Sequence, residues 1–344
     1  MANAVTPLIT PSYDDSGQAT EPSIVHFPNG WNGYQYWMVF APYPHSNDGY
    51  ENPSILVSDN GTEWSVPPGV TNPIERPGPG SRLADSSLFY DRMSRQLWLY
   101  YVSEDPTHYI NLLRTVSSDG VRWTKPIQVL RVPEYQLVMP AVASDGQQYW
   151  LWAVDAGTIG CSALSTRVLY RTSVDGVHWS VARPVHLQQP GYRIWHISVA
   201  TIPRFVFVEM GLLPGVHFES PSPDNPNWRS DWPNPWEDAA TIRRFLAAPV
   251  FLMLASSFKD RCGKDTLFLA YSSDGISWVN FPKPLLTPAE YSWDSSGIYE
   301  STLAYDFKSD ALRIWYSADG QAGWRIGLAQ ADFRSVIRDL IDNH

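Results

Sequence analysis

The chain has 344 residues, of which 14 % are aromatic and only 17 % are charged, below the roughly 25 % charged residues of an average globular protein. The formal net charge of −10 argues against the basic surface that binds nucleic acid. No apolar run approaches the roughly 18 residues of a membrane span, and the first residues lack the features of a secretory signal. We therefore expect no nucleic-acid partner, no membrane span, and a location in the cytoplasm or in a virus particle.

The first predicted elements are a short strand at 7–11, a strand that begins at Glu21 and an aromatic strand at 35–40. Enrichment in aromatic and β-branched residues is typical of strands. The pattern Ser-x-Asn-Gly-x-x-Trp follows at 58–64. Its Asn-Gly pair supplies the positive φ of a tight turn, and its Ser and Asn side chains can accept hydrogen bonds from nearby N–H groups. We interpret it as an architectural hairpin whose Trp covers the apolar layer beneath.

The same succession of elements recurs along the chain. Inner strands begin at Asp85 and Met139, and hairpins with Asp-Gly follow at 117–123 and 173–179. A fourth strand follows the hairpin, for example at 125–130. Four antiparallel strands in a unit of about 57 residues are typical of a β-propeller blade.

The fourth unit is longer than the others. Its inner strand begins at His196, its hairpin lies at 272–278, and the excess is an insertion at about 212–248 with three Trp residues. Either 205–208 or 251–254 forms its second strand. A long loop inside a compact domain is usually functional or disordered, and the Trp content argues against disorder. The insertion is the candidate surface for virion or homo-oligomer contacts.

The fifth unit begins at Glu300 but lacks a fourth strand after it. The segment at 7–11 has the same Pro-Leu-x-Thr-Pro pattern as 284–288, so we expect the N-terminal strand to complete blade five and close the ring. An amphipathic pattern at 333–342 predicts a short C-terminal helix. The prediction is thus an all-β, five-bladed propeller in a single domain over 1–344, with blades that start near 21, 85, 139, 196 and 300.

The inner strands of a propeller line its channel, so their first residues should gather at one mouth. These residues are Glu21, Asp85, Met139, His196 and Glu300. Like charges held together raise at least one pKa, and carboxyl groups with different pKa values are what glycosidic cleavage needs. Alternatively, the polar ring binds water or a stabilising cation. A single His argues against a transition-metal site but leaves Ca²⁺ open, with His196 as the candidate metal partner; no cofactor is required.

Aromatic and arginine residues flank this mouth in the sequence. Aromatic rings suit sugar faces, and Arg suits carboxylates. For each aromatic residue the alternative is core packing. Together with His196, the candidate ligand-binding residues are Arg82, Arg193, Trp195, Trp293 and Tyr299.

Over nearly its whole length, apart from the insertion and the C-terminal helix, the chain resembles the five-bladed propeller glycoside hydrolases (arabinanases, β-xylosidases and invertases). Its hairpins resemble the Asp-box repeats of sialidases. The five-bladed glycoside hydrolases use three acids on three consecutive blades. The resemblance to them implies that Glu300, Glu21 and Asp85 fill these roles. Glu300 and Asp85 would be the acid and base in an order left open, with Glu21 tuning their pKa values. Met139 stands where the family has its Glu acid if blades are counted from the first.

We expect a glycan-directed protein, and a glycoside hydrolase is the first hypothesis. The second is a non-catalytic glycan-binding or structural module, such as a phage virion or tail component that contacts a host surface. A protein-interaction scaffold is a third. Two cysteines cannot form a disulfide framework or a four-Cys metal site. We interpret Cys161 and Cys262 as ordinary thiols on compartment grounds, although a disulfide between loops of neighbouring blades is geometrically conceivable.

Overall fold

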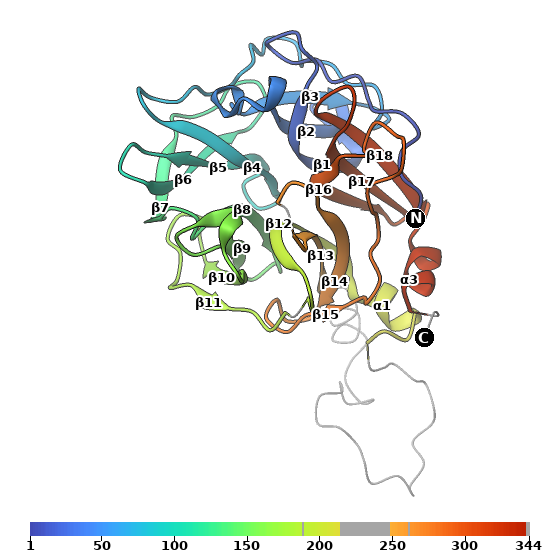
Figure 1. The fold of residues 1–344 in the computed structure, drawn as a ribbon. Coiled ribbons are helices and arrows are strands. Elements are labelled where there is room, and N and C mark those ends of the chain that lie inside the picture. The colour runs from blue at the N-terminus through green and yellow to red at the C-terminus, as the bar shows by residue number, and fades with distance from the viewer. Residues whose placement is uncertain (188, 214–247, 261, 342–344) are drawn as a thin grey trace, which may run out of the picture.

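The structure is a computed structural model that describes residues 1–187, 189–213, 248–260 and 262–341. Within these residues, five antiparallel sheets surround a central axis (Figure 1). Three sheets have four strands and two have three. The predicted all-β, five-bladed propeller is confirmed.

Each blade is a meander in which consecutive strands pair antiparallel. Blade one contains β1 (Ala19–Trp31), β2 (Tyr34–Pro42) and β3 (Ser54–Ser58). Blade two contains β4 (Arg82–Asp91), β5 (Gln96–Glu104), β6 (Tyr109–Ser117) and β7 (Ile127–Pro133). Blade three contains β8 (Val138–Ser144), β9 (Tyr149–Asp155), β10 (Arg167–Ser173) and β11 (Arg183–Pro184). Blade four contains β12 (Arg193–Pro203), β13 (Pro249–Phe258), β14 (Thr266–Ser272) and β15 (Val279–Asn280). Blade five contains β16 (Gly297–Asp306), β17 (Ala311–Asp319) and β18 (Arg325–Asp332).

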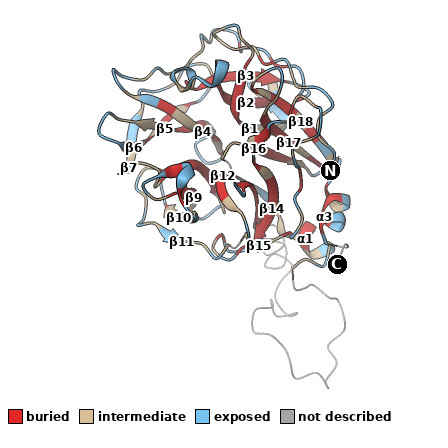
Figure 2. Cartoon of the chain, viewed as in Figure 1, coloured by how far each residue is buried: buried red, intermediate tan, exposed pale blue. Residues whose placement is uncertain are grey.

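The inner strands β1, β4, β8, β12 and β16 contact one another in this order around the axis, and β16 returns to β1. The strands nearest the axis are largely buried, while exposed residues concentrate in the peripheral strands and loops (Figure 2). The hydrophobic core lies between adjacent blades; for example, Trp37 of β2 packs with Leu97 and Leu99 of β5. Apolar contacts between neighbouring blades therefore hold the inner strands in place.

The hairpins make the local hydrogen bonds expected from their sequence. In blade two, the Ser117 hydroxyl oxygen accepts the N–H of Gly120 at 2.8 Å, and Asp119 Oδ1 accepts two further N–H groups. The other three copies repeat this arrangement. Gly120 has a φ of 75°, and a Cβ there would lie 2.1 Å from the ring of Trp37. The glycine is needed both for its backbone conformation and for close approach to the neighbouring blade.

The second strand of blade four is β13, which includes the alternative at 251–254. The other alternative, 205–208, lies in helix α1 (Arg204–Glu209). Pro203 ends the pairing of β12 with β13 and precedes this helix, whose Val206 and Phe207 are buried. The predicted insertion lies almost wholly outside the described residues, as do its three Trp residues.

The N-terminal segment lies beside blade five. In the described structure, one backbone hydrogen bond, from Leu8 N–H to Ile326 O at 2.8 Å, links the predicted strand at 7–11 to β18. The segment therefore extends blade five without forming a regular strand. Helix α3 (Phe333–Ile341) lies near α1 (Figure 1), and Phe333 contacts Phe207 across the two helices. The predicted C-terminal helix is confirmed.

The two cysteines form a disulfide, which is the alternative that the sequence left open and not the pair of ordinary thiols favoured on compartment grounds. Cys161 lies in the 3-10 helix η3 (Gly160–Ser162) between β9 and β10, and Cys262 lies between β13 and β14. Their Cα atoms are 5.6 Å apart, because these two loops meet at the border of blades three and four. The compartment argument carried no information about this geometry. Among the described residues, no helix is long and apolar enough to span a membrane.

Candidate functional site

The residues that the sequence placed at the starts of the inner strands lie one to three residues inside them, and several of them have an unusual backbone. Glu21, Asp85 and Met139 have φ values of 56°, 55° and 46°, a region that residues other than glycine rarely occupy. Each lies where the pairing of its inner strand with the second strand is interrupted. The pairing of β12 and β16 is interrupted next to His196 and at Glu300. Strain of this kind is often found at functional sites.

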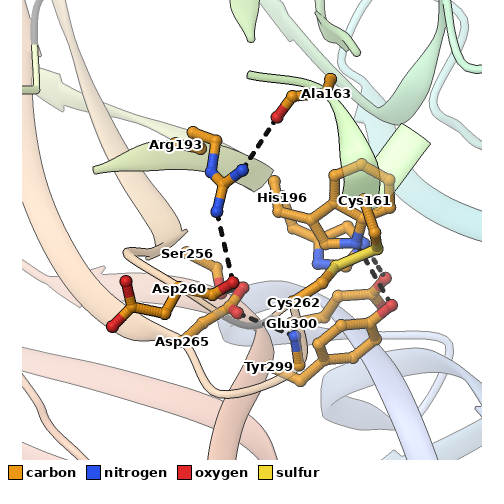
Figure 3. The surroundings of a disulfide bond; sticks show 12 residues. Cys161, Ala163, Arg193, His196, Ser256, Asp260, Cys262, Asp265, Tyr299 and Glu300 are labelled. Atoms are coloured by element: carbon orange, nitrogen blue, oxygen red, sulfur yellow. Dashed lines mark hydrogen bonds and ion pairs between the residues drawn. A yellow bond between two sulfur atoms is a disulfide. The ribbon is translucent and has the colours of Figure 1, made fainter. Parts of the chain in front are cut away.

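Three of these side chains come together at the axis. The Nε2 atom of His196 lies 2.9 Å from Oε1 of Glu300. One ligand atom each from Asp85, His196 and Glu300 lies within 4.8 Å of the others. We call these three residues the axial cluster. Figure 3 shows His196 and Glu300 side by side, with the disulfide close to them.

Backbone contacts tie the carboxyl groups to neighbouring blades. Asp85 Oδ2 accepts the N–H of Met139 at 3.0 Å, and Glu21 Oε2 accepts the N–H of Ser86 at 3.3 Å. Glu21 is 2 % exposed and Met139 is 3 % exposed. Each acid of blades one and two therefore binds the next inner strand, while Met139 offers an apolar side chain at its place in the ring.

Burial dominates the electrostatics of the site. It raises the pKa values of Glu21 and Glu300 well above the ordinary range, and the surrounding carboxylates raise both further. Burial also raises the pKa of Asp85, which His196 partly opposes. The pKa of His196 falls to about 4 because burial disfavours its charged form. At neutral pH the imidazole is therefore uncharged and keeps a lone pair for a ligand.

Two buried polar atoms of the axial cluster lack a hydrogen-bond partner within the described part of the chain. They are Nδ1 of His196 and Oε2 of Glu300. Buried polar atoms are nearly always paired with protein, water or an ion, so this arrangement is suited to a bound species.

Two further carboxyl groups at this end of the propeller were missed in the sequence. Asp265 is fully buried and accepts hydrogen bonds from Ser256 and from the N–H of Gly263. Burial raises its pKa to about 6, against the opposing effect of His196. Burial also raises the pKa of Glu51 well above its usual range, and Glu21 and Glu300 add to that shift. Both residues lie in loops that have no counterpart in the repeat pattern, so the alignment of blades could not identify them.

The five candidate ligand-binding residues other than His196 have different surroundings. Tyr299 packs edge-on against the ring of His196 at 4.4 Å, and its hydroxyl accepts the indole N–H of Trp195 at 3.3 Å. Trp195 is only 6 % exposed. These two residues therefore form a wall of the axial cluster.

The other three make structural contacts. Arg193 donates to Ala163 O and Lys259 O, at 2.9 and 2.6 Å, and joins the two loops that carry the disulfide (Figure 3). Arg82 forms ion pairs with two acidic residues, Asp48 and Glu104. Trp293 donates to Ala4 O at 2.9 Å and packs on Tyr316. Its contacts are thus with the N-terminal segment and blade five, as the alternative of core packing expects.

No family model matches the chain. A curated relative, the A type blood N-acetyl-alpha-D-galactosamine deacetylase of Flavonifractor plautii, is 25 % identical over 410 residues, covering 96 % of this chain and 47 % of the relative. The chain thus spans about half the length of that protein. A crystal structure of an N-acetylgalactosamine deacetylase from F. plautii, in complex with blood group B trisaccharide, superposes with a TM-score of 0.80 and 24 % identity, covering 100 % of this chain and 99 % of that one.

Glycoside hydrolases are also similar in structure. The catalytic domain of the GH62 α-L-arabinofuranosidase of Coprinopsis cinerea gives a TM-score of 0.59 at 13 % identity, with 95 % of both chains covered. The α-L-arabinanase of Penicillium chrysogenum, complexed with arabinobiose, gives 0.55 at 10 % identity, with 97 % of this chain and 98 % of that one covered. The predicted resemblance is confirmed. At these identities it establishes the fold alone.

Proposed function

We propose that the protein is a glycan-directed hydrolase that removes the acetyl group from an N-acetylated amino sugar, with a divalent cation at the axial cluster. The observation that carries the proposal is the convergence of Asp85, His196 and Glu300 within 4.8 Å. The relative that aligns with 96 % of this chain is a deacetylase of N-acetylgalactosamine, which supports this substrate class.

The residues of the cluster fit a divalent cation. Carboxylate and imidazole groups both bind divalent cations, and three protein ligands leave further coordination positions open. The imidazole is already neutral at pH 7 because burial lowers its pKa to about 4. Glu300 Oε2 and His196 Nδ1, which have no partner within the described residues, offer a further ligand atom and a position for an orienting contact. A bound cation would polarise the amide carbonyl and activate water for attack.

Neighbouring residues of this chain would handle protons and position the substrate. Burial and the acidic neighbours raise the pKa of Glu21 well above its ordinary range. A carboxyl group that stays protonated is suited to giving a proton to the departing amine. Tyr299 and Trp195 hold one side of His196 and present aromatic surface where a sugar ring can pack. Asp265, held by Ser256 and Gly263, adds a fixed negative charge beside the imidazole.

Glycoside hydrolysis is the second candidate, and the raised pKa of Glu21 favours it because such hydrolysis needs a protonated acid. The spacing of the other two carboxyl groups does not separate the two candidates. One oxygen of each lies within 4.8 Å of the other, which is compatible with the roughly 5–5.5 Å between carboxyl groups of retaining enzymes but not with the ~6.5–9.5 Å of inverting enzymes. We place deacetylation first because the curated relative that aligns with 96 % of this chain is a deacetylase.

The test is an assay of the purified protein on methyl N-acetylgalactosaminide and on blood-group oligosaccharides, with acetate, free amine and reducing sugar measured separately. We expect release of acetate and amine in equal amounts, loss of both on dialysis against a chelator, and recovery when Mn²⁺ or Zn²⁺ is added. His196→Ala should lower the rate at least about 100-fold. Glu63→Gln, at an exposed residue of the blade-one hairpin, is the matched control and should leave it unchanged.

Other outcomes would reject deacetylation. Release of reducing sugar without acetate would favour glycoside hydrolysis. Binding of these glycans without any turnover would favour a glycan-binding module. The disulfide supports a location in an oxidising compartment. If so, it should be present in protein isolated from its native source.

A further inference from the structure

A polar cavity of about 300 Å³ lies between blades five and one. Tyr36 of blade one lines it together with Asp306 and Arg313 of blade five. These residues lie near the end of an inner strand or the start of a second strand. Glu21 and Glu300 lie near the opposite ends of β1 and β16, so the cavity is on the other face of the propeller from the axial cluster.

The cavity lies where Arg313 stands in place of the Trp of three other blades; blade four has Leu252 at the same position. Arg313 of β17 pairs with Ala304, four residues beyond Glu300. In three other blades, the residue four positions after the equivalent of Glu300 pairs with a Trp on the second strand. These are Trp37 in β2, Trp98 in β5 and Trp150 in β9.

In those three blades the indole ring fills the space beneath the hairpin of the following blade. A Cβ on the hairpin glycine would lie 2.1 Å from Trp37 at Gly120, 2.4 Å from Trp98 at Gly176 and 3.2 Å from Trp150 at Gly275. At the hairpin of blade one, a Cβ on Gly61 would lie 2.8 Å from the ring of Trp315 and 3.6 Å from Nη1 of Arg313, so one indole is present there and the second is replaced by Arg313. A narrow guanidinium side chain thus replaces a broad indole, and space remains beside it.

The charged groups around this space are balanced in charge. Arg313 donates through Nη1 to the Tyr36 hydroxyl and to Asn60 O. His26 stacks on Tyr36 with ring centroids 4.4 Å apart, and burial lowers the pKa of His26. The cations that line the cavity are Arg313 and Lys308, and the carboxylates are Asp59 and Asp306.

We propose that this cavity is a second saccharide site, which binds one uncharged pyranose unit of a glycan. Each sugar hydroxyl both donates and accepts hydrogen bonds, so it can use the carboxylates and the cations together. An anionic ligand would meet the two carboxylates and a cationic ligand the two cations with like charge, and an apolar ligand would offer these four groups no hydrogen-bond partner. The volume is at the lower end for small-molecule sites, as suits a single sugar ring. The proposal goes beyond the deacetylase function and does not depend on it.

The repeat itself supplies the test variant, Arg313→Trp. Blade three shows the expected result, because Trp150 and Trp152 stack there at 5.6 Å beneath Gly275. Trp315 occupies the place of Trp152 and donates to Gly61 O at 2.8 Å, as Trp152 does to Gly275 O. The new indole should therefore fill the cavity in the way that blade three already does.

A hydrogen-bond acceptor for the indole N–H of a Trp at position 313 is also present. Asp145 accepts the indole N–H of Trp150 at 2.8 Å. Asp306 follows Glu300 by the same number of residues as Asp145 follows Met139, so it is placed to accept the N–H of a Trp at 313. The variant is expected to fold with a melting temperature at least equal to that of the parent protein.

Binding is measured by amide chemical shifts during titration with the methyl glycosides of galactose, glucose and N-acetylgalactosamine, and with acetate. We expect at least one neutral glycoside to shift the amides of Asn60 and Lys308 saturably, and acetate not to. Arg313→Trp should weaken that binding about tenfold or more while leaving acetate release at the axial cluster unchanged. This last comparison separates failure of this proposal from failure of the proposed function.

Three results would overturn the proposal. They are no shift with any neutral glycoside, a shift with acetate alone, or equal shifts in the parent protein and Arg313→Trp. Should that variant not fold, Asp59→Ala replaces it, because Asp59 is an exposed hairpin residue that lines the cavity. It should weaken glycoside binding about threefold or more, and unchanged binding would count against the site.

Discussion

His196 of blade four and Glu300 of blade five meet at the axis of the propeller, where Nε2 of His196 lies 2.9 Å from Oε1 of Glu300. They are 3 % and 1 % exposed. Each also has a second polar atom that lacks a partner within the described residues. This contact therefore involves only one polar atom of each buried side chain, and a species bound between them and Asp85 would give the other polar atoms a partner. This relationship underlies the account of the site.

Glu21→Gln should stabilise the metal-free protein, and increasingly so as the pH rises. Burial raises the pKa of Glu21, and Glu300 and Asp85 raise it further. A group with a raised folded-state pKa contributes most to stability below its unfolded pKa, and that contribution is lost as the pH rises through the folded pKa. Glutamine keeps the shape without ionising. The melting temperature of Glu21→Gln minus that of the parent protein, measured in chelator, should therefore grow between about pH 5 and about pH 9.

The control for this experiment is Glu63→Gln, whose difference from the parent protein should be independent of pH. A Glu21→Gln difference that is equally flat would show that Glu21 ionises without penalty, and the electrostatic description of the site would be wrong.

Loss of the disulfide should lower the stability of the protein. The bond closes a loop with a sequence separation of 101 residues, and native disulfides typically contribute about 2–4 kcal/mol. Cys161→Ser/Cys262→Ser should reduce the free energy of unfolding by about that amount in a urea titration. The parent protein in reductant should match the double variant. If reductant lowers the urea midpoint of the parent protein but not that of the variant, the effect is specific to the bond; equal stability with and without it would contradict the prediction.

Gly120→Ala should destabilise the fold strongly compared with Gly146→Ala. Both glycines have a positive φ, 75° and 88°, which costs an alanine about 1–2 kcal/mol. A Cβ at Gly120 would also lie 2.1 Å from Trp37, whereas nothing lies within 4 Å of one at Gly146. We expect a loss of about 1 kcal/mol at Gly146 and of at least about 3 kcal/mol at Gly120, by chemical denaturation. Equal losses would show that the hairpin does not depend on close approach to the neighbouring blade.

The sequence predicted the features that depend on the repeat. Because inner strands line the axis of a propeller, alignment of the blades was enough to bring Asp85, His196 and Glu300 to one mouth. The hairpin glycines likewise followed from local turn chemistry, which needs no knowledge of distant contacts.

Features outside the repeat could not be predicted. Asp265 and the Cys161–Cys262 disulfide lie in loops whose conformations depend on neighbouring blades. Trp293 precedes an inner strand but turns to the N-terminal segment, since a loop residue has no periodicity that fixes its direction. The pairing of His196 with Glu300, rather than of two carboxylates, depends on side-chain geometry between blades, and alignment carries no distances.

Calorimetric titration of the chelator-treated protein with Mn²⁺, Zn²⁺ and Ca²⁺ tests the central claim most directly. We expect one of these cations to bind with one equivalent per chain. His196→Ala and Glu300→Gln should each weaken that binding by at least about tenfold, while Glu63→Gln should leave it unchanged. Isotherms that are the same in the parent protein, His196→Ala and Glu300→Gln, or no binding of any of the three cations, would contradict the assignment of the axial cluster as a metal centre.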